Sequence, residues 1–290
     1  MGQALISIVF DGLAYGMLLF IIAVGLSITM GLMGFINLAH GAFAMAGGYA
    51  TVSLTQSLGV PFPWALVLAF LLVGGASVVF ERVLYARLYS ASELDQVLLS
   101  IGLVFMAVAA FTFFYGPAPQ RVAVPDYLSG QIDLGLRAFP TYRVFLIAVG
   151  LGLMAMLWLL FERTLIGARV RAAVDNRRMA QSVGIDVEAL FTWTFAFGSG
   201  LAAVGGGLAV DIVGLSPTFA IQYLVFFLIV VTVGGAGSLW GAFIAALILG
   251  FLDNAGKYLW PDGGAFFIYI ATVALLLRKP DGLFGRTQRS

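Results

Sequence analysis

This chain has no cysteine, no nucleotide-binding loop and only one histidine, and each of these features excludes a kind of chemistry. The chain has no cysteine, which excludes disulfides, thiolate metal sites and cysteine nucleophiles. One histidine, His40, cannot form a conventional metal-ligand cluster. No G-x-x-x-x-G-K-[ST] segment occurs, so no Walker loop is present to bind ATP phosphates. We expect no catalytic residue, no metal and no cofactor bound by this chain.

Charge is also scarce, and this sets the fold class. Charged residues make up 10% of the 290 residues, hydrophobic residues make up 61%, and the mean hydropathy is +1.04. A soluble domain of this composition would have nowhere to bury its apolar surface. No basic block suggests a nucleic acid partner. The sequence predicts an all-α polytopic membrane protein in which residues 1–290 form a single transmembrane domain.

Apolar runs that could cross a bilayer recur along the chain. A spanning helix needs about 20 such residues. The second run is polar and rich in glycine, and the seventh and eighth are separated only by "GGAGS", so broken or re-entrant helices are expected among 8 to 10 transmembrane helices. The nine candidate segments are 4–29, 34–55, 63–85, 95–115, 143–161, 190–213, 220–237, 239–256 and 265–278.

Basic residues then set the orientation, because Lys and Arg concentrate in cytoplasmic loops. If the spans alternate, eleven of the 15 lie on one side, which places the C-terminus and the loop 162–189 in the cytoplasm and the N-terminus outside. The loop 116–142 becomes an ordered external excursion. The eleven are Arg82, Arg87, Arg163, Arg169, Arg171, Arg177, Arg178, Arg278, Lys279, Arg286 and Arg289, against Arg121, Arg137, Arg143 and Lys257.

The loop 162–189 contains a segment with helical periodicity, "GARVRAAVDNRRMAQSVGID". Arg171, Asp175, Arg178 and Ser182 fall on one helical stripe, and small apolar residues crowd another face. Gly184 suits a helix C-terminus. We therefore expect one short amphipathic helix that docks on a cytoplasmic protein. The alternative is a basic anchor at the lipid headgroups. The apolar face comprises Ala172, Ala173, Met179, Ala180 and Val183.

Four motifs, in order along the chain, resemble those of branched-chain amino acid ABC transporter permeases of the LivH type. They are "GLSITMGLMGFINLAHGAFAMAGGY", "RVRAAVDNRRMAQSVGID", "VTVGGAGSLWGAFIAALILG" and "RKPDGLFGR". The resemblance implies that the amphipathic helix couples the permease to an ATPase subunit, and Arg171, Ala172, Ala180 and Gly184 fit that motif. The residues expected in coupling are Arg169, Arg171, Ala172, Asp175, Arg178, Ala180 and Gly184.

Asn37 and His40 form a polar pair three residues apart in an apolar segment. The spacing predicts that they share one helical face, above a stripe formed by Ala42, Ala46 and Ala50, and small stripes allow close helix packing. The pair could hydrogen-bond a neighbouring helix or could line the solute path. We favour packing, because a lone histidine without a charged partner usually serves as a satisfied core group.

Glycine-rich breaks are the better indicators of a solute path, since transporters often bind solute between discontinuous helices. Two interrupted segments occur, 31–48 and 234–241, whereas 198–209 is expected to be a helix-packing face. Asp11, Asp211 and Asp253 lie near span ends, where hydration is the favoured interpretation. The residues expected on the path or at its gate are Asn37, His40, Gly41, Gly48, Gly234, Gly235 and Gly237.

With the resemblance, these features predict a permease subunit of an ATP-driven importer in a bacterial inner membrane, carrying branched-chain or other hydrophobic amino acids or similar small amphipathic solutes. The resemblance implies a second related permease, two ATP-binding subunits that use the ATP, and a periplasmic solute-binding protein. An autonomous secondary transporter or channel is the alternative, and scarce intramembrane acids argue against it. A scaffold subunit of a quinone-linked enzyme would need Lys and Glu relays, and we expect none inside the spans.

Overall fold

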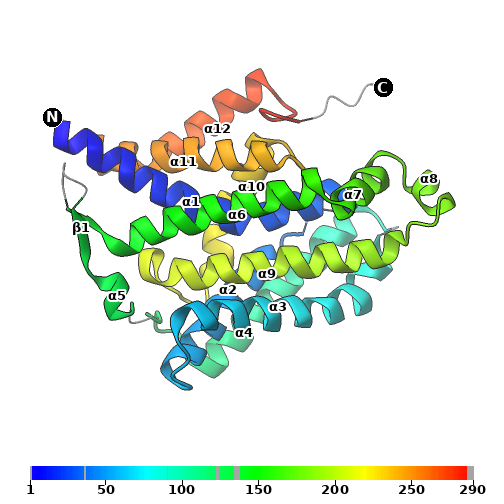
Figure 1. The fold of residues 1–290 in the computed structure, drawn as a ribbon, viewed down its shortest axis with the longest axis horizontal. Helices are drawn as coiled ribbons and strands as arrows, with labels where there is room; N and C mark the ends of the chain where they lie inside the picture. Colours follow the sequence, from blue (N-terminus) through cyan, green and yellow to red (C-terminus); the bar gives the residue numbers. More distant parts are fainter. Residues whose placement is uncertain (1, 36, 90, 122–123, 134–137, 286–290) are drawn as a thin grey trace.

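The fold is a bundle of helices whose long axes run nearly parallel (Figure 1). The computed structural model describes residues 2–285 except 36, 90, 122–123 and 134–137, so Arg137, Arg286 and Arg289 lie outside the described residues. The α-helices are α1 (Gly2–Met33), α2 (His40–Gln56), α3 (Phe62–Val83), α4 (Glu93–Tyr115), α5 (Asp126–Ser129), α6 (Thr141–Arg163), α7 (Leu165–Asp175), α8 (Arg177–Ser182), α9 (Val187–Val213), α10 (Phe219–Gly234), α11 (Leu239–Leu259) and α12 (Phe266–Arg278).

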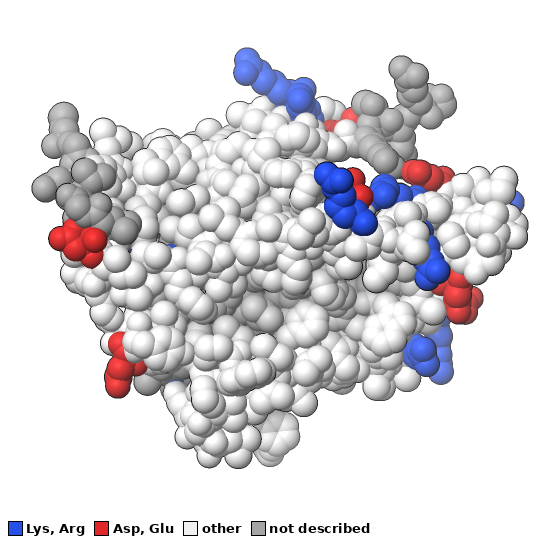
Figure 2. Space-filling model, in the orientation of Figure 1, with Lys and Arg blue, Asp and Glu red and all other residues white. Residues whose placement is uncertain are grey.

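The predicted spans correspond to helices of this bundle. Six described helices are long and apolar enough to cross a membrane, namely α1, α3, α4, α6, α9 and α11, and α10 and α12 are shorter apolar helices. Charged side chains gather near the ends of the molecule, and a broad surface between them carries almost none (Figure 2). This is the distribution expected of a protein that crosses a bilayer, and the all-α polytopic fold class is confirmed.

The ends of the helices sort into two groups. Leu32 at the end of α1 packs with Val170 of α7 and Val187 of α9, so these ends lie together. The end of α3, followed by the 3-10 helix Tyr85–Leu88, joins them through Glu81 and Thr192. We call this the arginine-rich end. At the opposite end the excursion 116–140 contains α5 and the antiparallel pair β1 (Gln131–Asp133) and β2 (Ala138–Pro140).

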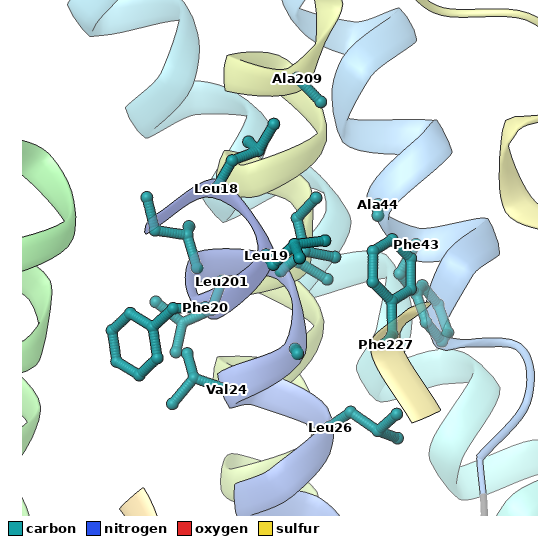
Figure 3. Close-up of a cluster of buried hydrophobic side chains, with 14 of the residues drawn as sticks. Leu18, Leu19, Phe20, Val24, Leu26, Phe43, Ala44, Leu201, Ala209 and Phe227 are labelled. Atoms are coloured by element: carbon teal, nitrogen blue, oxygen red, sulfur yellow. The ribbon is translucent and has the colours of Figure 1, made fainter. Parts of the chain in front are cut away.

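Helix α9 occupies the centre and packs closely on α1, α2 and α3 through glycine. A methyl group on Gly198 would meet the backbone of Gly25 in α1, and one on Gly47 in α2 would lie 2.1 Å from Cα of Ala203. Small residues let helices approach closely in a lipid environment, where van der Waals packing drives association. The expectation of a packing face at 198–209 is confirmed. The core around it includes Leu18, Leu19 and Phe20 of α1, with Phe43, Leu201 and Phe227 (Figure 3).

Helix α2 is only 17 residues long and begins deep inside the bundle. His40, its first residue, lies beside Ile22 of α1, and Ile22 is about 16 Å from the end of α1 at Met33 at the usual helical rise. Helix α10 begins close by, because a methyl group on Gly41 would come within 2.6 Å of the backbone oxygen of Ala220. Two short helices therefore start next to each other in the interior, as expected for broken helices.

Candidate functional site

The loop 162–189 contains two helices where the sequence predicted one. Helix α7 ends at Asp175 and α8 begins at Arg177, and between them Asn176 adopts an extended conformation (φ −155°, ψ 97°). The Asn176 side chain accepts a hydrogen bond from the Met179 N–H at 3.0 Å, which caps the new helix. The break interrupts the predicted stripe, so Arg171 and Ser182 belong to different helices. The prediction of a single helix is wrong because the Asn176 side chain caps a new helix at a point where the residue spacing still fits a continuous one.

The predicted apolar docking face is also divided. Ala173 and Ala180 are buried within the protein's own core, against α1 and α9, whereas Met179 and Val183 are 62% and 69% exposed. These exposed apolar side chains near the arginine-rich end are the ones available to a partner. Ala172 is half-buried, and Arg169, Asp175 and Arg178 are exposed.

Arg171 turns back onto its own protein. Its guanidinium donates to the backbone oxygen of Phe161 and lies 3.9 Å from the carboxylate of Glu162, both near the end of α6. A cation beside the last carbonyls of a helix stabilises that end. Arg171 therefore fixes α7 against α6, and its expected part in coupling to an ATPase subunit stays a prediction.

Gly184 ends α8 as predicted. Its φ is +86°, a conformation that glycine adopts without strain, and the Ile185 N–H donates to the Ala180 oxygen at 3.0 Å. Gly184 also lines a mostly apolar groove of about 790 Å³ with Arg169 and Trp193. We define the docking surface as Met179, Val183 and this groove, which is lined by Ile166, Arg169, Val183, Gly184, Ile185, Asp186, Ala189, Leu190 and Trp193.

A second cavity beside the docking surface contains a buried carboxylate that sequence reasoning missed. Glu81 of α3 is 2% exposed and accepts hydrogen bonds from the hydroxyls of Tyr89 and Thr192, the latter at 2.8 Å. Burial, followed by the bond to Glu81, raises the pKa of Tyr89, which keeps it protonated as a donor. The cavity, about 670 Å³, is also lined by Arg177 and Glu188. Glu81 lies near the end of the predicted span 63–85, and no pattern within that span marked it.

Asn37 and His40 do not share a helical face. Asn37 lies in the turn before α2, where its side-chain oxygen accepts from the Tyr85 hydroxyl at 2.9 Å and from the Ala39 N–H at 3.0 Å. His40 points elsewhere, with Nε2 2.8 Å from the backbone oxygen of Ile22. Both are 1% exposed. The bond to Ala39 makes a turn at Asn37 instead of a helix, which is why the predicted spacing fails.

The predicted small-residue stripe is shifted around α2. Ala46 and Ala50 are half-buried, whereas Ala44 and Gly47 contact α9: a methyl group on Gly206 would lie 1.8 Å from the Ala44 oxygen. The helix begins at His40, later than the pattern assumed, and the contact face is set by the glycines of α9. Packing interior to the bundle is as expected, through different residues.

The two predicted glycine breaks meet at one point, because a methyl group on Gly31 would lie 2.2 Å from Cα of Gly237, but their other glycines lie in different places. Gly41 contacts the start of α10, and Gly48 lies against Leu215 in the connection 214–218. Gly234, Gly235 and Gly237 instead form the turn between α10 and α11 at the arginine-rich end, where the Gly237 N–H donates to the Ser27 oxygen at 3.1 Å. The second interruption in the interior is thus 214–218, which the glycine pattern did not mark.

Of the three aspartates near span ends, two are accessible and one is not. Asp211 is exposed, and Asp11 forms an ion pair with Arg143. Asp253 of α11 is only 2% exposed, with Oδ2 2.5 Å from Nζ of Lys257. Helix-end hydration is therefore wrong for Asp253, because this side chain is covered inside the bundle although the last residues of α11 are exposed. The described residues hold no group of three or more His, Cys, Asp and Glu that could bind a metal.

Known proteins match this chain over nearly its whole length. The family model described as "Branched-chain amino acid transport system / permease component" matches residues 8–276. The high-affinity branched-chain amino acid transport system permease protein LivH of Escherichia coli K12 is 27% identical, covering 96% of this chain and 95% of that protein. The probable branched-chain amino acid transport permease protein LivH of Methanocaldococcus jannaschii is 27% identical, covering 93% and 90%.

A solved structure supports the fold. PsaBC from Streptococcus pneumoniae in complex with Fab has a chain that aligns with a TM-score of 0.50 at 17% identity, covering 96% of this chain and 92% of that one. The resemblance drawn from the four sequence motifs is confirmed by the family match. The chain belongs to the family of branched-chain amino acid transport system permease components.

Proposed function

We propose that this chain is one permease of an ATP-driven importer in a bacterial inner membrane, and that it carries branched-chain or similar hydrophobic amino acids. The partners are a second related permease, two ATP-binding subunits and a periplasmic solute-binding protein. The arginine-rich end faces the cytoplasm, in keeping with the preference of Lys and Arg for that side. The N-terminus is then periplasmic and the C-terminus cytoplasmic.

The docking surface is the single observation that carries the proposal. It is an exposed apolar surface on two short helices that are themselves fixed to α1, α6 and α9. A push on α8 is therefore transmitted to helices that span the bundle. The ATPase pair would close on ATP and move these helices, so that the two permeases rock between outward-open and inward-open states.

The interior of the bundle suits an amino acid as solute. The starts of α2 and α10 lie side by side, and neither has a side-chain cap. Helix N-termini carry partial positive charge that favours a carboxylate. Asn37, His40, Gly41 and Gly48 are assigned to this region of the solute path, with His40 in a packing role toward α1. Gly234, Gly235 and Gly237 act at its cytoplasmic end.

The test is leucine uptake by the complete transporter reconstituted in proteoliposomes. Gly184→Val and Arg171→Glu are expected to lower ATP-dependent uptake at least tenfold while the permease still inserts. Each substitution disturbs the contacts that position α7 and α8 against the rest of the bundle. Gly59→Val is the matched control, since Gly59 also has positive φ (+65°) but lies in the loop before α3, at the opposite end. Unchanged uptake and unchanged ATPase binding in both variants would exclude the docking assignment.

The same preparation separates the importer from an autonomous transporter. An importer takes up leucine only when ATP and the ATPase subunits are present. A secondary transporter or channel would do so in liposomes that contain the permease alone, in response to an ion gradient.

A further inference from the structure

Asp253 and Lys257 lie on α11 near the end of the bundle opposite the docking surface, and Tyr15 lies on α1, which packs against α11. The Lys257 ammonium lies 5.7 Å from the centre of the Tyr15 ring.

The Asp253 carboxylate is only half satisfied. Its side chain is 3% exposed, and Oδ2 is paired with Lys257. Oδ1 is buried and accepts no hydrogen bond from any described residue. A buried charged oxygen without a donor is costly, so this position lacks a donor that a ligand could supply.

The groups around Asp253 favour one kind of ligand. A carboxylate together with aromatic rings binds ammonium groups, through charge-assisted hydrogen bonds and cation–π attraction. Lys257 is itself a primary ammonium, and it already makes both contacts, one with the carboxylate and one with the Tyr15 ring. Lys257 therefore shows that a primary ammonium group can bind between the carboxylate and the aromatic ring.

Lys257 links the buried Asp253 to the molecular surface. The Lys257 side chain is 54% exposed and lies two residues before the end of α11 at Leu259. Charged groups on a membrane-spanning helix usually face a partner, a cavity or an aqueous path instead of lipid. We propose that Asp253, with the ring of Tyr15, binds the ammonium group of the incoming amino acid, and that Lys257 occupies the site until the solute arrives. This inference rests on the proposed function.

The experiment measures binding of three probes to the complete permease–ATPase assembly in nanodiscs, without the solute-binding protein. L-Leucine carries both charges, isopentylamine carries only the ammonium, and 4-methylpentanoate carries only the carboxylate. L-Leucine and isopentylamine are expected to bind and to displace each other, whereas 4-methylpentanoate leaves this site empty. Equal binding of the amine and the carboxylate, or binding of sodium ions that blocks the amine at equal concentration, would overturn the proposal.

Two substitutions with opposite expected effects separate a solute site from a structural ion pair. Asp253→Asn is expected to weaken binding of leucine and isopentylamine about tenfold or more, whereas Lys257→Gln strengthens it by removing the competing ammonium. Asp262→Asn, an exposed aspartate in the α11–α12 connection, is the control and leaves binding unchanged. If Asp253→Asn and Lys257→Gln weaken binding alike, the pair is only structural.

Asp253→Glu keeps the negative charge and is the variant to test if Asp253→Asn fails to fold. It is expected to retain amine binding, and loss of amine binding in a folded Glu variant would also overturn the proposal. ATP-driven leucine uptake by the unmodified transporter is measured in parallel. If that uptake is absent, the proposed function fails; if uptake is present but the probes do not discriminate by their ammonium group, only this inference fails.

Discussion

Glu81 shows what one buried residue does at the arginine-rich end. Its two carboxylate oxygens join α3 to Thr192 of α9 and to Tyr89. Hydrogen bonds to a charged group contribute about 1.5–3 kcal/mol, against about 0.5–1.5 kcal/mol for neutral pairs. Glu81→Gln is therefore expected to lower the free energy of unfolding by about 1–2 kcal/mol, measured by denaturation of the purified permease in detergent.

A double-mutant cycle tests whether the effect comes from the bond to Thr192. Thr192→Val should destabilise the wild type but should cost less when Glu81 is already Gln, because contacting residues are not additive. Glu188→Gln is the matched control: it lines the same cavity but is exposed, and a change within about 0.5 kcal/mol is expected. Strict additivity of the first two substitutions would mean that the bond contributes nothing.

At the scale of helices, the break at Asn176 decides the shape of the docking surface. The Asn176 side chain caps α8, and loss of such a cap costs about 1 kcal/mol. Asn176→Ala is expected to speed hydrogen exchange of the backbone amides in residues 179–183 about fivefold, as measured by mass spectrometry. Ser182→Ala, in the same short helix, removes a bond to the Met179 oxygen but leaves the N-terminal cap in place, and it should change exchange less. Unchanged exchange in Asn176→Ala would mean that packing of Ala180 alone holds α8.

The helices themselves were predictable, whereas their interruptions were not. Long apolar runs such as 143–161 are predictable because a helix that crosses a bilayer needs about 20 consecutive apolar residues, and that pattern lies within one segment. At Asn37 and Asn176 the side-chain oxygen accepts a hydrogen bond from the backbone N–H two or three residues later. These bonds break the helix although the spacing of the neighbouring residues still fits a continuous one. The partners of His40 and Glu81 lie on other helices, so no spacing within one segment could identify them.

The last described segment connects distant parts of the chain at the arginine-rich end. After α12, the Leu283 and Phe284 N–H groups donate to the oxygens of Val233 and Gly234, at 2.7 and 3.1 Å. The turn that receives them donates in its own right to Ser27 of α1 through Gly237, at 3.1 Å. The chain after α12 is thus linked to the first helix through the α10–α11 turn, and the fourth sequence motif has a structural role.

The contact between the last described segment and the α10–α11 turn depends on Gly282. Its φ is +83°, and a methyl group there would lie 2.5 Å from the Thr232 oxygen and 2.6 Å from the Gly235 nitrogen. Gly282→Ala is expected to lower the free energy of unfolding by about 2–3 kcal/mol, because it adds a backbone clash to the cost of positive φ, which is about 1–2 kcal/mol. Hydrogen exchange of the amides in residues 235–238 should rise with it.

Gly59→Ala separates the two contributions. Gly59 also has positive φ, at +65°, but a methyl group there would meet nothing within 4 Å, so it reports the conformational cost alone. If Gly282→Ala lowers the free energy of unfolding no more than Gly59→Ala does, and exchange at residues 235–238 is unchanged, the last segment does not hold the α10–α11 turn. A larger loss confined to Gly282→Ala, with faster exchange in that turn, follows if the last segment holds the turn against α1.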